Sequence, residues 1–289
     1  MLARADRTGN NARVDNRDLV VVRSEDGRIV AHIDPSHGGR VAQLAVDDLP
    51  LLIGPDHPDA REPLGWGCYP MVPYCGRVRD ARFTFDGRVH DLPRTAEPHS
   101  IHGTTFDRDW RVVTANSSSV EMCTDLGPRW PFRGRSTHRV SVERGALVMS
   151  LTLEADEDMP AMVGWHPWFR KPERSPVGLV SMLRRDRAGI ATTEIVHRPS
   201  GSVDDCFVGR FDGRTDDKNQ VNEFLTFRVG SVSVAVSSDC SHWVLYDEPT
   251  HATCVEPQSG PPNQIDDDPL VLAGGESLTR WFRLEVTPS

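Results

Sequence analysis

Lysine is almost absent from this chain, with only Lys171 and Lys218 among its 33 basic residues. Dense runs of basic residues are also lacking, and 42 acidic residues give a formal net charge of −9. This composition argues against nucleic acid as the main partner, because phosphate backbones are bound by clustered Lys and Arg. The preference for Arg extends over the whole chain, so it does not locate a site.

Cysteine pairs and long apolar runs are missing as well. The six cysteines contain no CxxC pair and no spacing typical of zinc sites, and a disulfide scaffold needs far more cysteine in a shorter chain. No apolar run approaches the length of a membrane span, and the polar start of the chain has no signal-peptide core. We therefore expect a reduced, soluble, cytoplasmic protein without a membrane partner, and residues 1–16 as a flexible arm.

Helical periodicity is absent, whereas strand-like alternation is found throughout. No window of a dozen residues sustains an apolar stripe at helical spacing. The Asp86-Gly87 turn between two alternating runs predicts a hairpin of Arg82–Phe85 with Arg88–Leu92. Further strands are predicted at Asp18–Val22, Arg28–Ile33, Ser119–Cys123, Arg139–Glu143, Ala146–Glu154, Phe224–Val229, Ser231–Ser237, His242–Tyr246 and Ser277–Val286.

Many short strands without long helices predict an all-β, antiparallel fold. A closed barrel and a multi-sheet sandwich would both fit, whereas the lack of a fixed repeat argues against a propeller or solenoid. Because no change of composition marks a linker, we expect residues 17–289 to form one domain. Segments 170–177 and 212–219 are expected to be surface loops.

Five segments interrupt the strand pattern with polar residues set among aromatic residues and prolines. Their polar residues have structural alternatives: an ion pair with Asp80 for Arg77, packing between tryptophans for His166, a core role for His102, and turn caps for Asp204 and Glu256. The segments are Gly67–Val78, His99–Gly103, Gly164–Phe169, Asp204–Phe207 and Cys254–Asn263.

The joint composition of these segments is typical of a carbohydrate site. Sugar hydroxyls need charged and amide groups that donate and accept in fixed directions. The apolar faces of pyranose rings lie against aromatic rings, for which Trp130, Trp165 and Trp168 are candidates. The chain has no dinucleotide fingerprint, no P-loop and no Gly-x-Ser-x-Gly elbow.

Taken in order, the segments resemble the aldose 1-epimerase (galactose mutarotase) family over nearly the whole chain. Two departures leave the sugar open: Gly76 stands where the family has Asn, and Trp168 stands where the galactose enzymes often have Tyr. The matching motifs are Gly38–Leu44, Gly76-Arg77, Arg82–Gly87, Ile101-His102-Gly103, His166-Pro-Trp-Phe169, Asp204-Asp-Cys-Phe207, Glu256-Pro-Gln258 and Leu272–Leu278.

The resemblance implies a large antiparallel β-supersandwich that uses neither cofactor nor metal and acts on a small-molecule sugar, as a monomer or a homodimer. Glu256 would be the base that takes the proton of the anomeric O1 hydroxyl, and His166 the acid that protonates the ring oxygen O5. Ring opening and reclosure would then exchange the anomers. Arg77 and His102 would hold the ring-oxygen side, and Asp204 the distal hydroxyls.

Two expectations follow for the acid and the base. O1 and O5 are bonded to one carbon, so we expect the groups that serve them to lie about 5–8 Å apart. We also expect the carboxylate of Glu256 to raise the pKa of His166, which keeps the imidazole a useful acid at pH 7.

Three alternatives remain at this point. A hexose-6-phosphate epimerase would need extra arginines at the distal end of the pocket, such as Arg79, Arg82 or the Arg133/Arg135 pair. A sugar-binding module without catalysis would need no acid and base. A metal-dependent, cupin-like enzyme would use His99, His102 and His166, although His99-x-x-His102 is their only close pair.

Overall fold

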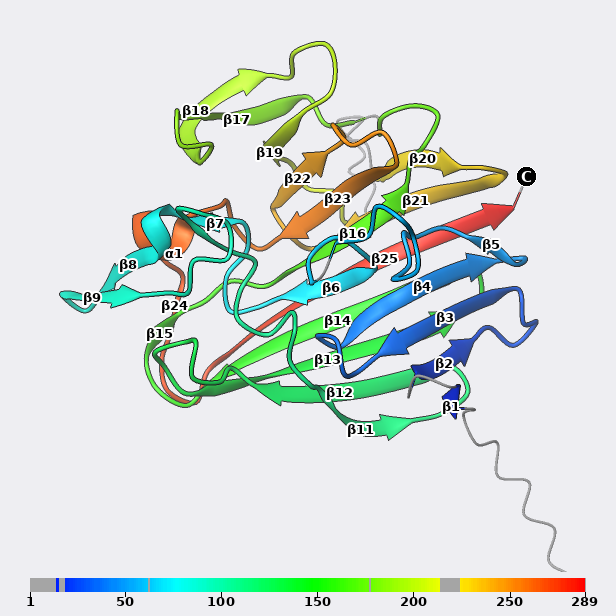
Figure 1. Cartoon of the computed structure of the whole chain (residues 1–289), viewed down its shortest axis with the longest axis horizontal. Helices are drawn as coiled ribbons and strands as arrows, with labels where there is room; N and C mark the ends of the chain where they lie inside the picture. The colour runs from blue at the N-terminus through cyan, green and yellow to red at the C-terminus, as the bar shows by residue number, and fades with distance from the viewer. Residues whose placement is uncertain (1–13, 16–18, 62, 177, 214–223, 289) are drawn as a thin grey trace, which may run out of the picture.

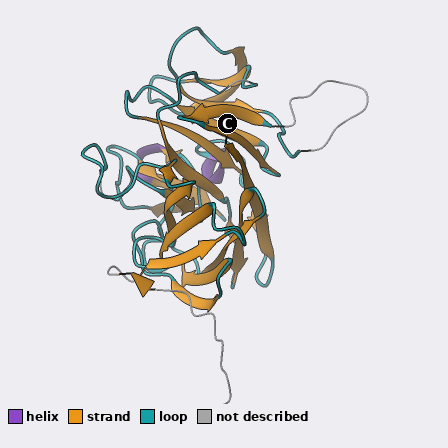
Figure 2. Ribbon diagram, turned by 90° about the vertical axis from the view of Figure 1, so that its right-hand side faces the viewer, coloured by secondary structure: helices purple, strands orange, loops and turns teal. Residues whose placement is uncertain are grey.

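Two large antiparallel sheets make up most of the protein, so the predicted all-β antiparallel fold is confirmed (Figures 1 and 2). The computed structural model describes residues 14–15, 19–61, 63–176, 178–213 and 224–288. The first sheet has twelve strands. In spatial order they are β1 (Val14–Asp15), β2 (Leu19–Arg23), β3 (Ile29–Asp34), β4 (Arg40–Val46) with β5 (Leu49–Pro50) beside it, β6 (Cys68–Met71), β16 (Gly164–Arg170), β23 (Ala252–Gln258), β22 (His242–Tyr246), β19 (Asp204–Val208), β17 (Ser181–Arg185) and β18 (Ala191–His197).

The second sheet has seven strands, and in its long strands buried residues mostly alternate with more exposed ones. In β13, for example, every second residue is buried, as expected for a strand with one face on the core. In spatial order the strands are β11 (Arg111–Ala115), β12 (Ser119–Asp125), β13 (Gly134–Glu143), β14 (Ala146–Ala155), β25 (Ser277–Pro288), β21 (Val232–Ser238) and β20 (Leu225–Val229).

Aromatic side chains from the two sheets meet in the core between them. Trp165 of β16 and Trp243 of β22 pack against Phe282 of β25, with ring centroids 5.8 and 6.2 Å apart. Phe169 of β16 meets Phe227 of β20 edge-on at 4.8 Å. These contacts fix β16 and β22, which flank β23, against the second sheet.

Short elements make up the rest of the regular secondary structure in the described residues. The predicted Asp86-Gly87 hairpin is present, and among the described residues the single α-helix is only four residues long. The elements are β7 (Arg77–Val78) with β10 (Ser100–Ile101), the 3-10 helix η1 (Arg79–Ala81), β8 (Arg82–Phe85) with β9 (Arg88–Asp91), β15 (Met159–Pro160) with β24 (Val271–Leu272), and α1 (Gln264–Asp267).

Three further predictions concern the N-terminal arm, two surface loops and the number of domains. Of the predicted arm, residues 1–13 and 16 lie outside the described residues, and Val14–Asp15 pair with β2. Residues 171–176 have no regular secondary structure, as predicted, but Arg170, the first residue of that predicted loop, is the last residue of β16. Residues 177 and 214–219 of the two predicted loops are not described. The buried residues of one core cluster come from Val20 to Val286, and one domain over residues 17–289 stays a prediction.

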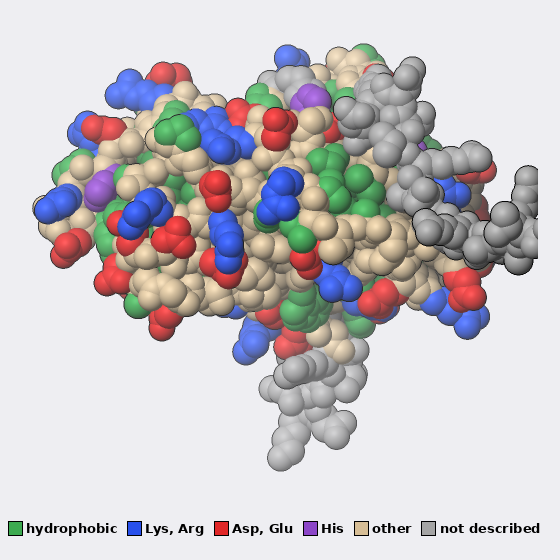
Figure 3. Space-filling model, turned by 90° about the horizontal axis from the view of Figure 1, so that it is seen from below, with side chains coloured by type: hydrophobic (Ala, Val, Ile, Leu, Met, Phe, Trp, Pro, Cys, Tyr) green, Lys and Arg blue, Asp and Glu red, His purple; other side chains and the backbone are tan. Residues whose placement is uncertain are grey.

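The surface and the helices add two observations. Figure 3 shows acidic and basic side chains intermixed over one face of the molecule. No helix in the described ranges is long and apolar enough to cross a membrane.

Candidate active site

A hollow of about 410 Å³ lies over the middle of the first sheet, and it is lined by the five residues to which the resemblance gives a role and by Trp168, but not by Trp130 or Trp165, which are buried in the core. Its floor comes from β6, β16, β22 and β23, and its rim from β7, β10, β17, β19 and nearby loops. The lining includes Tyr69, Gly76, Arg77, His102, His166, Trp168, Arg185, Asp204, Asp205, Tyr246, Glu248, Glu256, Gln258 and Pro262.

His166 is held on β16 by flat aromatic rings. Its imidazole lies between Tyr69 at 4.9 Å and Trp168 at 5.3 Å, each inclined by 18°, and His102 meets it edge-on at 4.7 Å. Of the two tryptophans that were the structural alternative for His166, only Trp168 packs against its ring. Trp165 points away into the core between the sheets, where it is fully buried.

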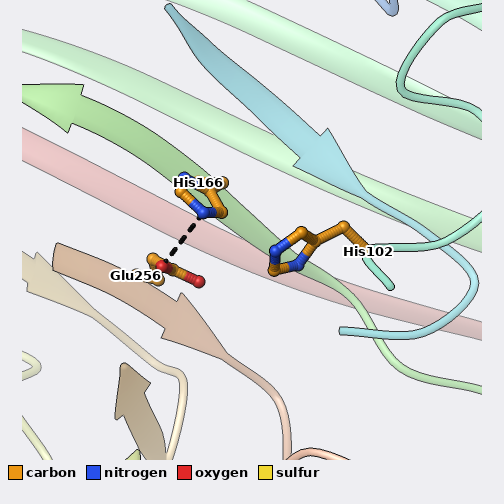
Figure 4. Close-up of side chains that lie close together, drawn as sticks. All are labelled: His102, His166 and Glu256. Carbon is orange, nitrogen blue, oxygen red and sulfur yellow. Dashed lines mark ion pairs between the residues drawn. The ribbon is translucent and has the colours of Figure 1, made fainter. Parts of the chain in front are cut away.

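Glu256 faces His166 from the neighbouring strand β23. The Oε1 atom of Glu256 lies 3.1 Å from Nε2 of His166, and both side chains are almost fully buried (Figure 4). Oε2 accepts a hydrogen bond of 3.1 Å from Nε2 of Gln258. The separation of 5–8 Å that we expected is thus wrong. Since O1 and O5 share one carbon, two adjacent groups can reach both oxygens by nearly parallel hydrogen bonds.

The pair lies where the pairing of β16 with β23 is interrupted. The register pairs Gly164 with Gln258 and Trp168 with Cys254, but it pairs none of the residues between them. Each unpaired stretch contains a proline, Pro167 or Pro257, which has no N–H to give to a ladder. The segments of His166 and Glu256 are therefore strands and not loops, and the prolines open the gap between them.

His102 completes the group from the loop after β10. Its backbone is left-handed (φ 60°), and its N–H donates to the carbonyl of Gly76 over 3.1 Å. Gly76 is itself left-handed (φ 64°), and a Cβ atom there would lie 2.7 Å from the ring of Pro262. Pro262 thus fills the space that a side chain at position 76 would need, which accounts sterically for the departure from Asn.

Arg77 and Asp204 meet at the opposite side of the hollow. Nη2 of Arg77 lies 3.5 Å from Oδ2 of Asp204, so Asp204 and not Asp80 is its ion-pair partner. The same oxygen of Asp204 accepts a hydrogen bond of 2.9 Å from Arg185. Asp204 lies opposite Tyr246 in the β19–β22 ladder, so it is in a strand and does not cap a turn.

Sequence reasoning missed Arg185, Asp205 and Tyr69. Arg185 reaches the hollow because β17 lies beside β19, a pairing that no local pattern reveals, whereas Asp205 directly follows Asp204 on β19. Tyr69 is part of a predicted polar segment, but nothing in the sequence indicates that its ring supports His166.

The sequence profile of the family described as aldose 1-epimerase matches residues 21–285. The chain belongs to the aldose 1-epimerase family. Over 107 residues it is 28% identical to the uncharacterized protein YphB of Escherichia coli, a match that covers 35% of this chain and 36% of that protein.

Solved structures of related proteins share the fold. A galactose mutarotase-like protein from Clostridium acetobutylicum superposes with a TM-score of 0.76 at 17% identity, covering 91% of this chain and 94% of that one. Galactose 1-epimerase from Lactobacillus acidophilus gives 0.74 at 15% identity, covering 97% and 98%. At these identities the likeness extends to the fold alone.

Burial dominates the electrostatics of the site in this aldose 1-epimerase family member. It raises the pKa of Glu256 well above 4.5 and lowers the pKa of His166 to about 3. The expected rise at His166 is therefore wrong, because desolvation of the buried imidazole is the largest effect on its pKa, and burial also disfavours the charged form of Glu256. A carboxylic acid beside a neutral imidazole, sharing one proton, is the form that burial favours.

His102, His166 and Glu256 are also the described residues that could together hold a metal ion, with ligand atoms within 4.8 Å of one another. Two imidazoles and a carboxylate suit zinc or iron. The predicted histidine set is wrong in one member. His99 lies outside this group, where Nδ1 accepts the backbone N–H of Asp80 (3.1 Å) and Nε2 lies 3.2 Å from the carbonyl of Ala188.

Proposed function

We propose that this protein is an aldose 1-epimerase that interconverts the α and β anomers of a neutral, unphosphorylated aldose. The observation that carries the proposal is the buried His166–Glu256 contact at the floor of a polar hollow. Such a pair carries a proton donor and a proton acceptor side by side, and anomer exchange needs one of each.

In the proposed mechanism, Glu256 accepts the proton of the O1 hydroxyl while His166 gives a proton to O5. The bond between C1 and O5 breaks, and C1 becomes the carbonyl carbon of the open-chain aldehyde. After rotation about C1–C2, O5 attacks the other face of C1, and both protons return. Each of the two groups accounts for about 10²–10⁴-fold of the rate.

The reactive form of the pair is the ionised one, a carboxylate beside an imidazolium. It has the same number of protons as the neutral form that burial favours. Hydrogen bonds donated by sugar hydroxyls to the carboxylate favour ionisation, and the positive charge of Arg77 acts in the same direction on Glu256. Substrate binding would thus prepare the pair for catalysis.

Arg77, His102 and Asp204 are proposed to hold the sugar. The guanidinium donates in a fixed fork, and the carboxylate accepts from hydroxyls on the far side of the ring. His102 offers a buried Nδ1 atom that has no hydrogen-bond partner among the described residues.

The charges around the hollow favour a neutral sugar over a hexose 6-phosphate. Among the described residues, none of the four arginines named for a phosphate site lines the hollow, and each pairs with an acid elsewhere. A phosphate dianion would meet an excess of acidic groups. The hollow is lined by four acids and two arginines: Asp204, Asp205, Glu248, Glu256, Arg77 and Arg185.

Exchange between anomers, followed by NMR saturation transfer over a panel of aldoses and hexose 6-phosphates, tests the proposal. We expect acceleration with neutral aldoses and little with the phosphates. If sugars bind and no exchange is accelerated, the protein is a sugar-binding module and the proposed function is wrong. If a chelator abolishes the activity, the metal-dependent alternative replaces the acid–base mechanism.

A further inference from the structure

A second hollow of about 560 Å³ adjoins the candidate active site, and the two share one wall. The shared residues are Leu64, Trp168, Tyr246 and Glu248. The rest of its lining comes from the loop before β6 and the turn between β22 and β23, and consists of Asp59, Arg61, Gly65, Pro249, Thr250 and His251.

The shared wall is held rigidly. Nε1 of Trp168 donates a hydrogen bond of 2.7 Å to the carbonyl of Leu64. The Trp168 indole stacks with His166 at 5.3 Å on the catalytic side and with His251 at 6.3 Å on the other. His251 in turn stacks on His57 at 5.7 Å. A fixed aromatic ridge thus separates the two hollows, with the edge of Tyr246 against it at 5.9 Å.

Polar groups around the second hollow are free to bind a ligand. Within the described ranges, the side chains of Arg61, Glu248 and Thr250 are exposed and make no hydrogen bond or ion pair. Donors and acceptors beside aromatic rings are what a carbohydrate requires. The composition of the second hollow therefore matches that of the first.

The position of the second hollow suits a particular linkage. Tyr246, in the shared wall, lies opposite Asp204 in the β19–β22 ladder, and Asp204 is proposed to bind the hydroxyls farthest from C1. Anomer exchange requires a free O1 hydroxyl, so any second sugar residue must be attached through another hydroxyl. A second sugar residue attached on the distal side would therefore extend across this wall into the second hollow.

We propose that the second hollow is a subsite for the second residue of a reducing disaccharide, whose reducing unit occupies the active site. The inference rests on the proposed function. It makes disaccharides linked through a distal hydroxyl, such as position 4 or 6, better substrates than the free monosaccharide.

The test compares kcat/KM for anomer exchange of glucose with that of maltose, cellobiose and gentiobiose, measured by NMR. We expect at least one disaccharide to exceed glucose by about tenfold in the wild type. Thr250→Trp, which fills the hollow, and Arg61→Ala, which removes a donor, should each remove that advantage. Both variants should leave the glucose value within about twofold, as should Arg139→Ala on the exposed face of β13.

The outcomes separate the inference from the proposed function. If glucose is exchanged but no disaccharide is preferred, or if the variants lower both substrates alike while their unfolding midpoints match the wild type, the subsite is wrong and the proposed function stands. If no sugar is exchanged, both are wrong. A variant that fails to fold is replaced by Thr250→Phe, judged by the same ratio.

Discussion

Each of the two large sheets buries a histidine, and the two imidazoles differ in the partners of their ring nitrogens. His138 on β13 of the seven-stranded sheet is fully buried: Nδ1 donates to the carbonyl of Gly39 over 3.0 Å, and Nε2 accepts from Trp165 over 3.1 Å. His166 on β16 of the twelve-stranded sheet contacts Glu256 through Nε2, and its Nδ1 has no partner among the described residues. Both pKa values are lowered by burial, to about 4 and about 3.

The difference teaches that burial alone does not distinguish a structural histidine from a reactive one. Partners on both ring nitrogens fix one neutral tautomer in His138, so its proton has no route elsewhere. His166 shares a proton with a carboxyl group at the floor of a hollow. The strands of the two sheets also differ in burial: every second residue of β13 is buried, whereas all seven residues of β23 are buried. A charged residue in such a strand therefore points to function.

The largest effect that would distinguish the site on the twelve-stranded sheet from the buried histidine of the seven-stranded sheet is the loss of catalysis in Glu256→Gln. We expect kcat/KM for anomer exchange to fall by about 10²–10⁴-fold, because the amide can neither take nor give the proton. The unfolding midpoint should stay or rise, since a buried carboxyl group with a raised pKa destabilises the fold. Glu121→Gln on β12 is the matched control. Activity within tenfold of the wild type in Glu256→Gln would remove Glu256 from the mechanism.

For His138→Ala we expect a loss of stability with little change in catalysis. Removing the ring leaves a cavity, and it leaves the Gly39 carbonyl and the Trp165 N–H without hydrogen-bond partners. We therefore expect a loss of roughly 2–4 kcal/mol in the free energy of unfolding. Urea unfolding measures this loss, and kcat/KM per folded molecule should remain within about twofold. A large fall in kcat with an unchanged free energy of unfolding would show that His138 is more than structural.

Acid should destabilise the protein through buried histidines outside the His166–Glu256 pair, because burial lowers the pKa of His102 well below 6.5 and also lowers that of His138. The pKa of His138 is lowered from 6.5 to about 4, so its contribution to stability is complete above pH 6.5 and is lost as the pH falls toward 4. Between pH 7 and pH 5 this amounts to roughly 2 kcal/mol. The His166–Glu256 pair holds one proton when folded, and it also holds about one when unfolded between pH 4.5 and 6.5, so its net contribution there is small.

Urea unfolding at pH 7 and pH 5 tests this assignment. The double variant His166→Asn/Glu256→Gln removes the whole pair, so it should keep the loss on acidification that the wild type shows. If that variant abolishes the loss, the His166–Glu256 pair, and not His138 and His102, is what acid disrupts.

Local patterns were sufficient for the regular parts of the fold. The bounds of β8 and β22 agree with the predicted ranges to the residue, because alternation and turn residues are encoded locally. The first half of β13 was missed. There Ser136 and His138 occupy inward positions, and His138 is satisfied by a carbonyl 99 residues away, which no local pattern reveals.

The candidate site was predicted from the sequence only in part. The order of the motifs was sufficient to bring His102, His166 and Glu256 together, since the resemblance carries their spatial relation. The electrostatics were wrong, because the pKa of His166 depends on burial between Tyr69 and Trp168, which follows from long-range packing. Arg185 was missed for the same reason.

The smallest effect concerns two left-handed glycines, one in each region. Gly145, in the turn between β13 and β14, has φ 77° and open space around its Cα, so Gly145→Ala costs only the backbone strain, about 1–2 kcal/mol. Gly76 has φ 64° and would also drive its Cβ to 2.7 Å from Pro262. Gly76→Ala should therefore destabilise the protein by about 1–2 kcal/mol more than Gly145→Ala.

Pro262→Ala isolates the steric part of this difference. In that background, Gly76→Ala should cost about as much as Gly145→Ala does in the wild type, because only the strain of the left-handed backbone remains. Thermal unfolding of the four variants gives the comparison. If the excess cost of Gly76→Ala persists without Pro262, then the glycine is required by the backbone of the His102 loop and not by the proline that fills the hollow's edge.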